Sequence, residues 1–154
     1  MQTPRWKDVR DDWLPDDGVR NLDVPETEDG GQAVVEMIRA RPDRATRYTE
    51  DGVDVAMPRA VSMISSRIQY TSHLWQITLP RGVVANCRFV PGLLDIDLDP
   101  RDIRGQDDFD VVCDFITAVA SAAGERVGVT PEGMDDCVIL AFDPAIGEFT
   151  HSAS

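Results

Sequence analysis

The stretch Leu74–Leu98, LWQITLPRGVVANCRFVPGLLDIDL, decides the fold of this chain. Apolar and polar side chains alternate along it, most clearly from Leu74 to Leu79. A period of two is typical of a β-strand that buries one face. Turn-forming proline and glycine residues at 80–82 and 91–92 divide the stretch into three. We therefore expect three short strands joined by tight turns, which form an antiparallel meander.

The clearest helix is expected after this meander, from Asp107 to Ala123. Its apolar residues repeat every three or four positions and would form one inward stripe: Phe109, Val112, Cys113, Ile116, Ala120 and Ala123. Aspartates in the first turn suit the positive end of the helix dipole, and Gly124 suits the position after the last turn.

The rest of the chain predicts shorter elements. A short helix that begins at Thr3-Pro4 would dock Trp6 and Trp13 onto the body of the protein, and residues 15–31 predict a loop, so that 1–31 is largely loop. The further expected elements are a helix at 32–41, a hairpin of 45–49 and 53–57, a helix over 58–72, and strands at 126–130, 137–142 and up to 149. The predicted class is α+β, a single domain over 1–154 with an antiparallel meander sheet and two to four helices.

Composition favours a soluble, cytoplasmic protein of the bacterial type. The 154 residues carry a net charge of −13, which disfavours both nucleic acid and anionic membranes as partners. No apolar leader or membrane-spanning stretch is expected. The three cysteines, Cys87, Cys113 and Cys137, lie far apart and form no zinc-binding or disulfide pattern, as is typical of a reducing compartment.

The charge is unevenly distributed along the chain. Residues 1–54 hold fourteen acids and eight bases, residues 55–94 hold four arginines and no acid, and residues 95–154 hold fourteen acids and three bases. Core strands exclude carboxylates, which accounts for the acid-free middle segment. The acidic excess after residue 95 is less easily explained in this way.

Eight aspartates in that last segment are the candidate partner-binding residues: Asp95, Asp97, Asp99, Asp102, Asp107, Asp108, Asp110 and Asp114. Such a concentration of charge costs stability through repulsion and speeds association with a basic protein. This interpretation requires that the carboxylates form one surface and have no local arginine partners.

Two of these aspartates also raise the possibility of a divalent-metal site. On a strand, Asp95 and Asp97 share one face, and the string is similar to the paired-aspartate strand of nucleotidyltransferases. The Gly-Ser element of that family is absent, and Pro100 and Gln106 occupy positions where a calcium loop needs Gly and Glu. A solvated outer face of an exposed strand is the favoured explanation, and no metal or cofactor is expected.

The remaining reactive side chains do not predict a catalytic site. His73 is expected to open the first meander strand, as a turn residue and not a catalytic base, and His151 is expected at a frayed terminus. The sequence has no Gly-x-Ser-x-Gly element around which a Ser/His/Asp site could form. The three cysteines are expected to be buried as small apolar residues.

In size, charge and architecture the chain resembles the immunity proteins that neutralise toxic nucleases. The resemblance implies a binding protein, not an enzyme, whose aspartates meet lysines and arginines of a toxin, with Tyr70 or Trp75 as an apolar anchor. Two alternatives stay open. One is a small metal-dependent enzyme that uses Asp95 and Asp97; the other is a structural or assembly component whose Trp6/Trp13 arm contacts other subunits.

Overall fold

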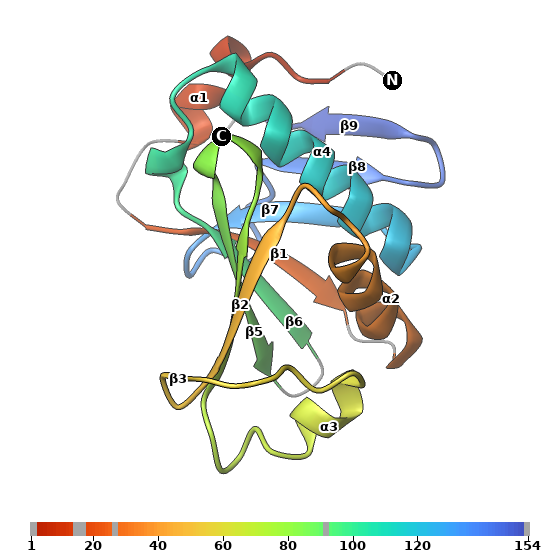
Figure 1. The fold of residues 1–154 in the computed structure, drawn as a ribbon. Helices are drawn as coiled ribbons and strands as arrows, with labels where there is room; N and C mark the ends of the chain where they lie inside the picture. The colour runs from red at the N-terminus through yellow and green to blue at the C-terminus, as the bar shows by residue number, and fades with distance from the viewer. Residues whose placement is uncertain (1–2, 14–17, 26–27, 91–92, 153–154) are drawn as a thin grey trace.

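The computed structural model describes residues 3–13, 18–25, 28–90 and 93–152, and these residues form four α-helices and nine strands (Figure 1). The helices are α1 (Trp6–Trp13), α2 (Glu28–Arg39), α3 (Val61–Ser65) and α4 (Gln106–Ala123). The strands are β1 (Arg20–Pro25), β2 (Ala45–Glu50), β3 (Val53–Asp54), β4 (His73–Thr78), β5 (Val84–Val90), β6 (Leu93–Leu98), β7 (Val127–Pro131), β8 (Leu140–Asp143) and β9 (Glu148–His151). None of the helices in these ranges combines the length and the apolar character needed to cross a membrane.

All nine strands belong to one antiparallel sheet in the order β3-β2-β4-β5-β6-β1-β7-β8-β9. The α+β class and the meander of β4, β5 and β6 are confirmed. The first meander turn is a 3-10 turn, η1 (Pro80–Gly82), in which Arg81 has a φ of 64°. The second predicted turn, Pro91-Gly92, lies outside the described residues.

The predicted loop over residues 15–31 is wrong where β1 and the start of α2 are found. Leu22 and Val24 are fully buried, and β1 pairs with β6 on one side and β7 on the other. Two alternating apolar residues are too few to indicate a strand by periodicity. The strand forms because two neighbouring strands, which follow much later in the sequence, supply its hydrogen-bond partners on both edges.

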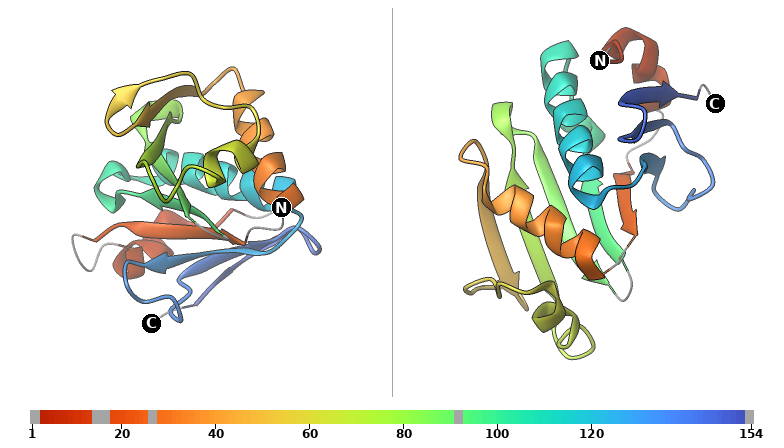
Figure 2. Two further views of the ribbon diagram at one scale, coloured as in Figure 1. Left: turned by 90° about the horizontal axis from the view of Figure 1, so that it is seen from below. Right: turned by 90° about the vertical axis from the view of Figure 1, so that its right-hand side faces the viewer.

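α2 and α4 lie side by side on one face of the sheet (Figure 2), and α1 contacts α4. The predicted stripe of α4 is confirmed, since Phe109, Val112 and Ile116 have no exposed surface. The predicted docking of α1 is also confirmed: the rings of Trp6 and Trp13 lie 5.3 and 5.7 Å from that of Phe109. α2 runs beside α4, and α3 contacts α2.

Several predicted boundaries differ from the structure. The second strand of the hairpin, expected over 53–57, is β3 and ends at Asp54. α2 begins at Glu28 instead of residue 32, and its first turns pass through the buried Gly30 and Gly31. The helix expected over 58–72 is reduced to α3, because Ser66 and Thr71 donate their hydroxyls to backbone carbonyls of the preceding turns and compete with helix continuation. The strand expected from residue 137 begins at Leu140.

Candidate functional site

The two aspartates of β6, Asp95 and Asp97, share the sheet face that lies opposite the helices. Leu94, Ile96 and Leu98 are buried in the core, so Asp95 and Asp97, which alternate with them, point the other way. The sequence predicted this shared orientation. It did not show what stands beside each carboxylate on the neighbouring strands.

Asp97 is buried and has partners on β5. Its carboxylate accepts a hydrogen bond from the Asn86 side-chain amide at 3.2 Å and is paired with the guanidinium of Arg88. Asn86 in turn lies beside Gln76 on β4. Both oxygens of Asp97 are engaged, so a cation bound here would have to displace Arg88 and Asn86. Among the described residues no group of three or more His, Cys, Asp or Glu side chains is placed to hold a metal ion.

Asp99 and Asp102 are occupied at the end of β6. Asp99 precedes the second 3-10 turn, η2 (Pro100–Asp102), and accepts hydrogen bonds from the backbone and guanidinium of Arg101. The side-chain hydrogen bond with Arg101 lowers the pKa of Asp99. Asp102 accepts a bond from the backbone N–H of Val84 at 3.3 Å. Both carboxylates therefore help to fix the junction between β6 and α4.

Asp108 has a structural position at the start of α4. Its side chain is only 3% exposed, and it pairs with Arg81 at 2.7 Å and Arg104 at 3.1 Å. It also accepts a hydrogen bond from the backbone N–H of Arg104 at 3.0 Å. The hydrogen bond with Arg81, followed by that with the backbone of Arg104, lowers the pKa of Asp108 to about 2. Its carboxylate is neutralised within the protein.

The other three aspartates lie along the outer side of α4, and we call them the α4 acidic line: Asp107, Asp110 and Asp114. Their spacing places them on neighbouring turns of the helix. Asp107 and Asp114 are exposed, and Asp110 accepts a hydrogen bond from the uncharged Gln106 side chain at 2.8 Å.

Asp114 also attracts Arg44, whose guanidinium lies 5.2 Å from the Phe115 ring centroid. The eight predicted aspartates are thus not one surface of free carboxylates: Asp97, Asp99 and Asp108 are paired with arginines. The α4 acidic line is what remains of the predicted surface.

The histidines have structural partners. His73 is buried at the first position of β4, between the hydroxyl of Tyr48 at Nδ1 and that of Thr71, 2.6 Å from Nε2. Burial raises the pKa of Tyr48 to about 12. His151 is not frayed but is the last residue of β9, and its Nε2 lies 2.9 Å from a carboxylate oxygen of Asp12 on α1.

The cysteines differ in burial. Cys87 and Cys113 are buried as expected, and burial raises the pKa of both thiols. Cys137 is half-buried, which corrects the expectation that it lies in the core. It precedes β8, and its backbone N–H bonds to Met134 across a turn.

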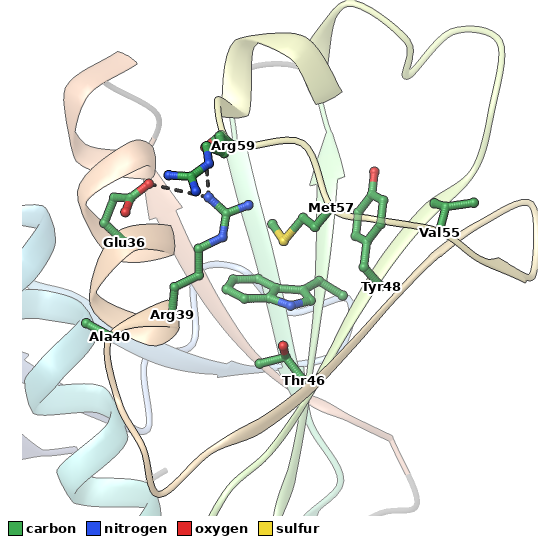
Figure 3. A pocket seen from close by; sticks show the side chains of 9 residues that line it. Glu36, Arg39, Ala40, Thr46, Tyr48, Val55, Met57 and Arg59 are labelled. Atoms are coloured by element: carbon green, nitrogen blue, oxygen red, sulfur yellow. Dashed lines mark hydrogen bonds and ion pairs between the residues drawn. The ribbon is translucent and has the colours of Figure 1, made fainter.

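A pocket that the sequence did not predict lies between α2 and the β2–β3 hairpin (Figure 3). We call it the α2–hairpin pocket; its volume is about 560 Å³. It is lined by Glu36, Arg39, Ala40, Thr46, Tyr48, Val55, Met57, Arg59 and Trp75. The one sequence signal that pointed to it is the acid-free segment 55–94, from which four of these residues come.

Comparisons of this chain with protein-family models, with curated proteins and with solved structures found no match. The functional argument therefore rests on the residues and contacts described above.

Proposed function

We propose that this chain is a binding protein that docks on a basic surface of a partner protein, as an immunity protein does on a toxic nuclease. The observation that carries the proposal is the α4 acidic line. These carboxylates lie on the outer side of a long, well-packed helix, and no arginine forms an ion pair with them in the described parts of the chain. Arg44 attracts Asp114 but forms no ion pair with it in the described residues, so most of the charge of the line is not neutralised within the protein. Charge held in this way on a rigid helix favours a cationic partner through steering and complementarity.

The rest of the molecule supports a binding role for this helix. The inner side of α4 is anchored in the core by Phe109, Val112 and Ile116. Its outer side is therefore presented without the cost of ordering a loop on binding. The net charge of −13 adds a long-range attraction for a basic partner. Unpaired cysteines fit a reducing compartment, and a cytoplasmic location in a bacterium is part of the proposal.

The test uses as binding partner a basic protein that co-purifies with this chain from its native source, and the absence of any such protein would count against the proposal. The dissociation constant and the association rate constant are measured for the intact chain and for the triple variant Asp107→Asn/Asp110→Asn/Asp114→Asn. We expect the association rate constant to fall about tenfold at low salt, with a smaller difference at high salt, because screening removes the steering.

A matched control separates a specific surface from the effect of total charge. The triple variant Glu132→Gln/Asp135→Asn/Asp136→Asn removes the same charge from exposed positions between β7 and β8. We expect this control to keep nearly all of the affinity. Equal losses in the two triple variants, or tight binding that does not respond to salt, would contradict the proposal.

A further inference from the structure

The wall of the α2–hairpin pocket is fixed by hydrogen bonds from α2. The guanidinium of Arg39 donates to the carbonyl oxygens of Pro58 at 2.5 Å and Arg59 at 2.8 Å. Gln32 donates its side-chain amide to the carbonyl of Arg59 at 3.0 Å and accepts from the N–H of Val61 at 2.8 Å. The segment between β3 and α3 is thereby held beside α2 and forms one wall of the pocket.

The charge inside this pocket has the opposite sign to that of the whole protein. Arg39 and Arg59 contribute two guanidinium groups, and Glu36 is the only carboxylate among the lining residues. Glu36 is engaged by Arg39 at 3.4 Å and by the Gln32 amide at 2.8 Å. Arg59 is exposed, and its guanidinium pairs with no carboxylate in the described ranges. One positive charge is therefore left at the mouth of the pocket.

Apolar side chains complete the pocket. Val55 is 40% exposed and Met57 is half-buried, and the buried Trp75 and Tyr48 also line the pocket. Figure 3 shows Val55 and Met57 on the segment that follows the hairpin, across the hollow from Arg39 and Glu36 on α2. Ligand pockets combine such an apolar lining with a few placed polar groups, and the volume lies in their usual range of about 300–1,000 Å³.

We infer that the α2–hairpin pocket binds a small organic anion, in which a carboxylate or phosphate group is carried on an apolar body. The anionic group pairs with Arg59, whose planar guanidinium matches both kinds of oxyanion. The apolar body lies against Met57 and Val55 and removes their surface from water. This site is separate from the α4 acidic line and does not depend on the proposed protein partner.

The experiment follows methyl and indole resonances of the intact chain by NMR while 4-phenylbutyrate is titrated through the millimolar range. We expect saturable shifts of the Val55 and Met57 methyl groups and of the Trp75 indole N–H. Phenyl phosphate tests a phosphate group in place of the carboxylate, again attached to an apolar phenyl ring. Two controls each lack one part of the ligand: 4-phenylbutyramide has no anionic group, and inorganic phosphate has no apolar part. Both are expected to bind at least about tenfold more weakly than 4-phenylbutyrate.

Two variants test the assigned roles. Arg59→Gln should lower the affinity for 4-phenylbutyrate about tenfold, because one charge-assisted contact is lost. Val55→Ser should lower this affinity by a smaller factor. Both side chains are exposed, so neither change should unfold the protein. Arg126→Gln removes the same charge from an exposed position before β7 and should leave binding unchanged. Absence of saturable shifts at Val55 and Met57, equal binding of the amide, or equal loss in Arg126→Gln would overturn the inference.

Discussion

The aspartates of β6 and those of the α4 acidic line are similar in sequence and opposite in their surroundings. Both groups lie in the same acidic stretch, and both sets point away from the core. On β6, neighbouring strands bring Asn86 and Arg88 against Asp97. On the outer side of α4, no arginine of the described residues forms an ion pair with Asp107 or Asp114, although Arg44 attracts Asp114. A cluster of acids therefore indicates a binding surface only where the fold supplies no internal cations.

The largest effect expected from this comparison is on stability, at the pair of Arg88 and Asp97. Arg88→Ala leaves the buried carboxylate of Asp97 with the hydrogen bond from the Asn86 side-chain amide at 3.2 Å. We expect the free energy of unfolding to fall by about 2–3 kcal/mol, because an uncompensated buried charge is costly and Arg88 itself is half-exposed. Urea denaturation at neutral pH measures the change.

Removing the charge of Asp97 as well should restore part of the lost free energy of unfolding. We expect the double variant Arg88→Ala/Asp97→Asn to be at least about 1 kcal/mol more stable than Arg88→Ala alone. A double variant that is no more stable than the single one would show that the ion pair is not what holds Asp97 in place.

A smaller effect is expected at Asp108, and it depends on pH. The folded protein holds the pKa of Asp108 at about 2, below its ordinary value of about 4. The stabilisation is therefore fully present above the ordinary pKa and is lost as the pH falls through that of the folded state. We expect the free energy of unfolding to decline between about pH 5 and pH 2, and to decline less in Asp108→Asn.

Asp108→Asn should also be less stable than the unaltered chain at neutral pH, since Arg81 and Arg104 lose a charged partner. The substitution keeps the size of the side chain, so the loss should be smaller than that for Arg88→Ala. If the free energy of unfolding changed with pH in the same way in the unaltered chain and in Asp108→Asn, the role assigned to Asp108 would be contradicted.

The smallest effect is expected on α4, with the opposite sign. Asp114→Asn should raise the free energy of unfolding by about 0.2–0.5 kcal/mol, because it relieves repulsion with Asp110 one turn away. The gain should shrink as salt is added. A loss of 1 kcal/mol or more would mean that the attraction between Asp114 and Arg44 outweighs this repulsion, and that the two groups of aspartates do not differ as described.

Part of the fold could be predicted because some segments carry their own periodicity. The alternation in Leu74–Leu98 and the stripe of α4 are local patterns, and the structure confirms both. β1 has no comparable pattern, since its strand conformation depends on β6 and β7. The α2–hairpin pocket was missed for the same reason, because its lining comes from α2, β2, β4 and the segment after β3.

By itself, the sequence determined the α+β class, the meander, the long helix and the face of β6 on which its aspartates lie. Each follows from side-chain periods along a single segment. Only the tertiary structure decided which carboxylates stay free and which pair with arginine, and where a cationic pocket opens on an acidic protein. The physical reason is that electrostatic interactions depend on distances through space, and strand register and helix docking, which bring distant residues together, set those distances.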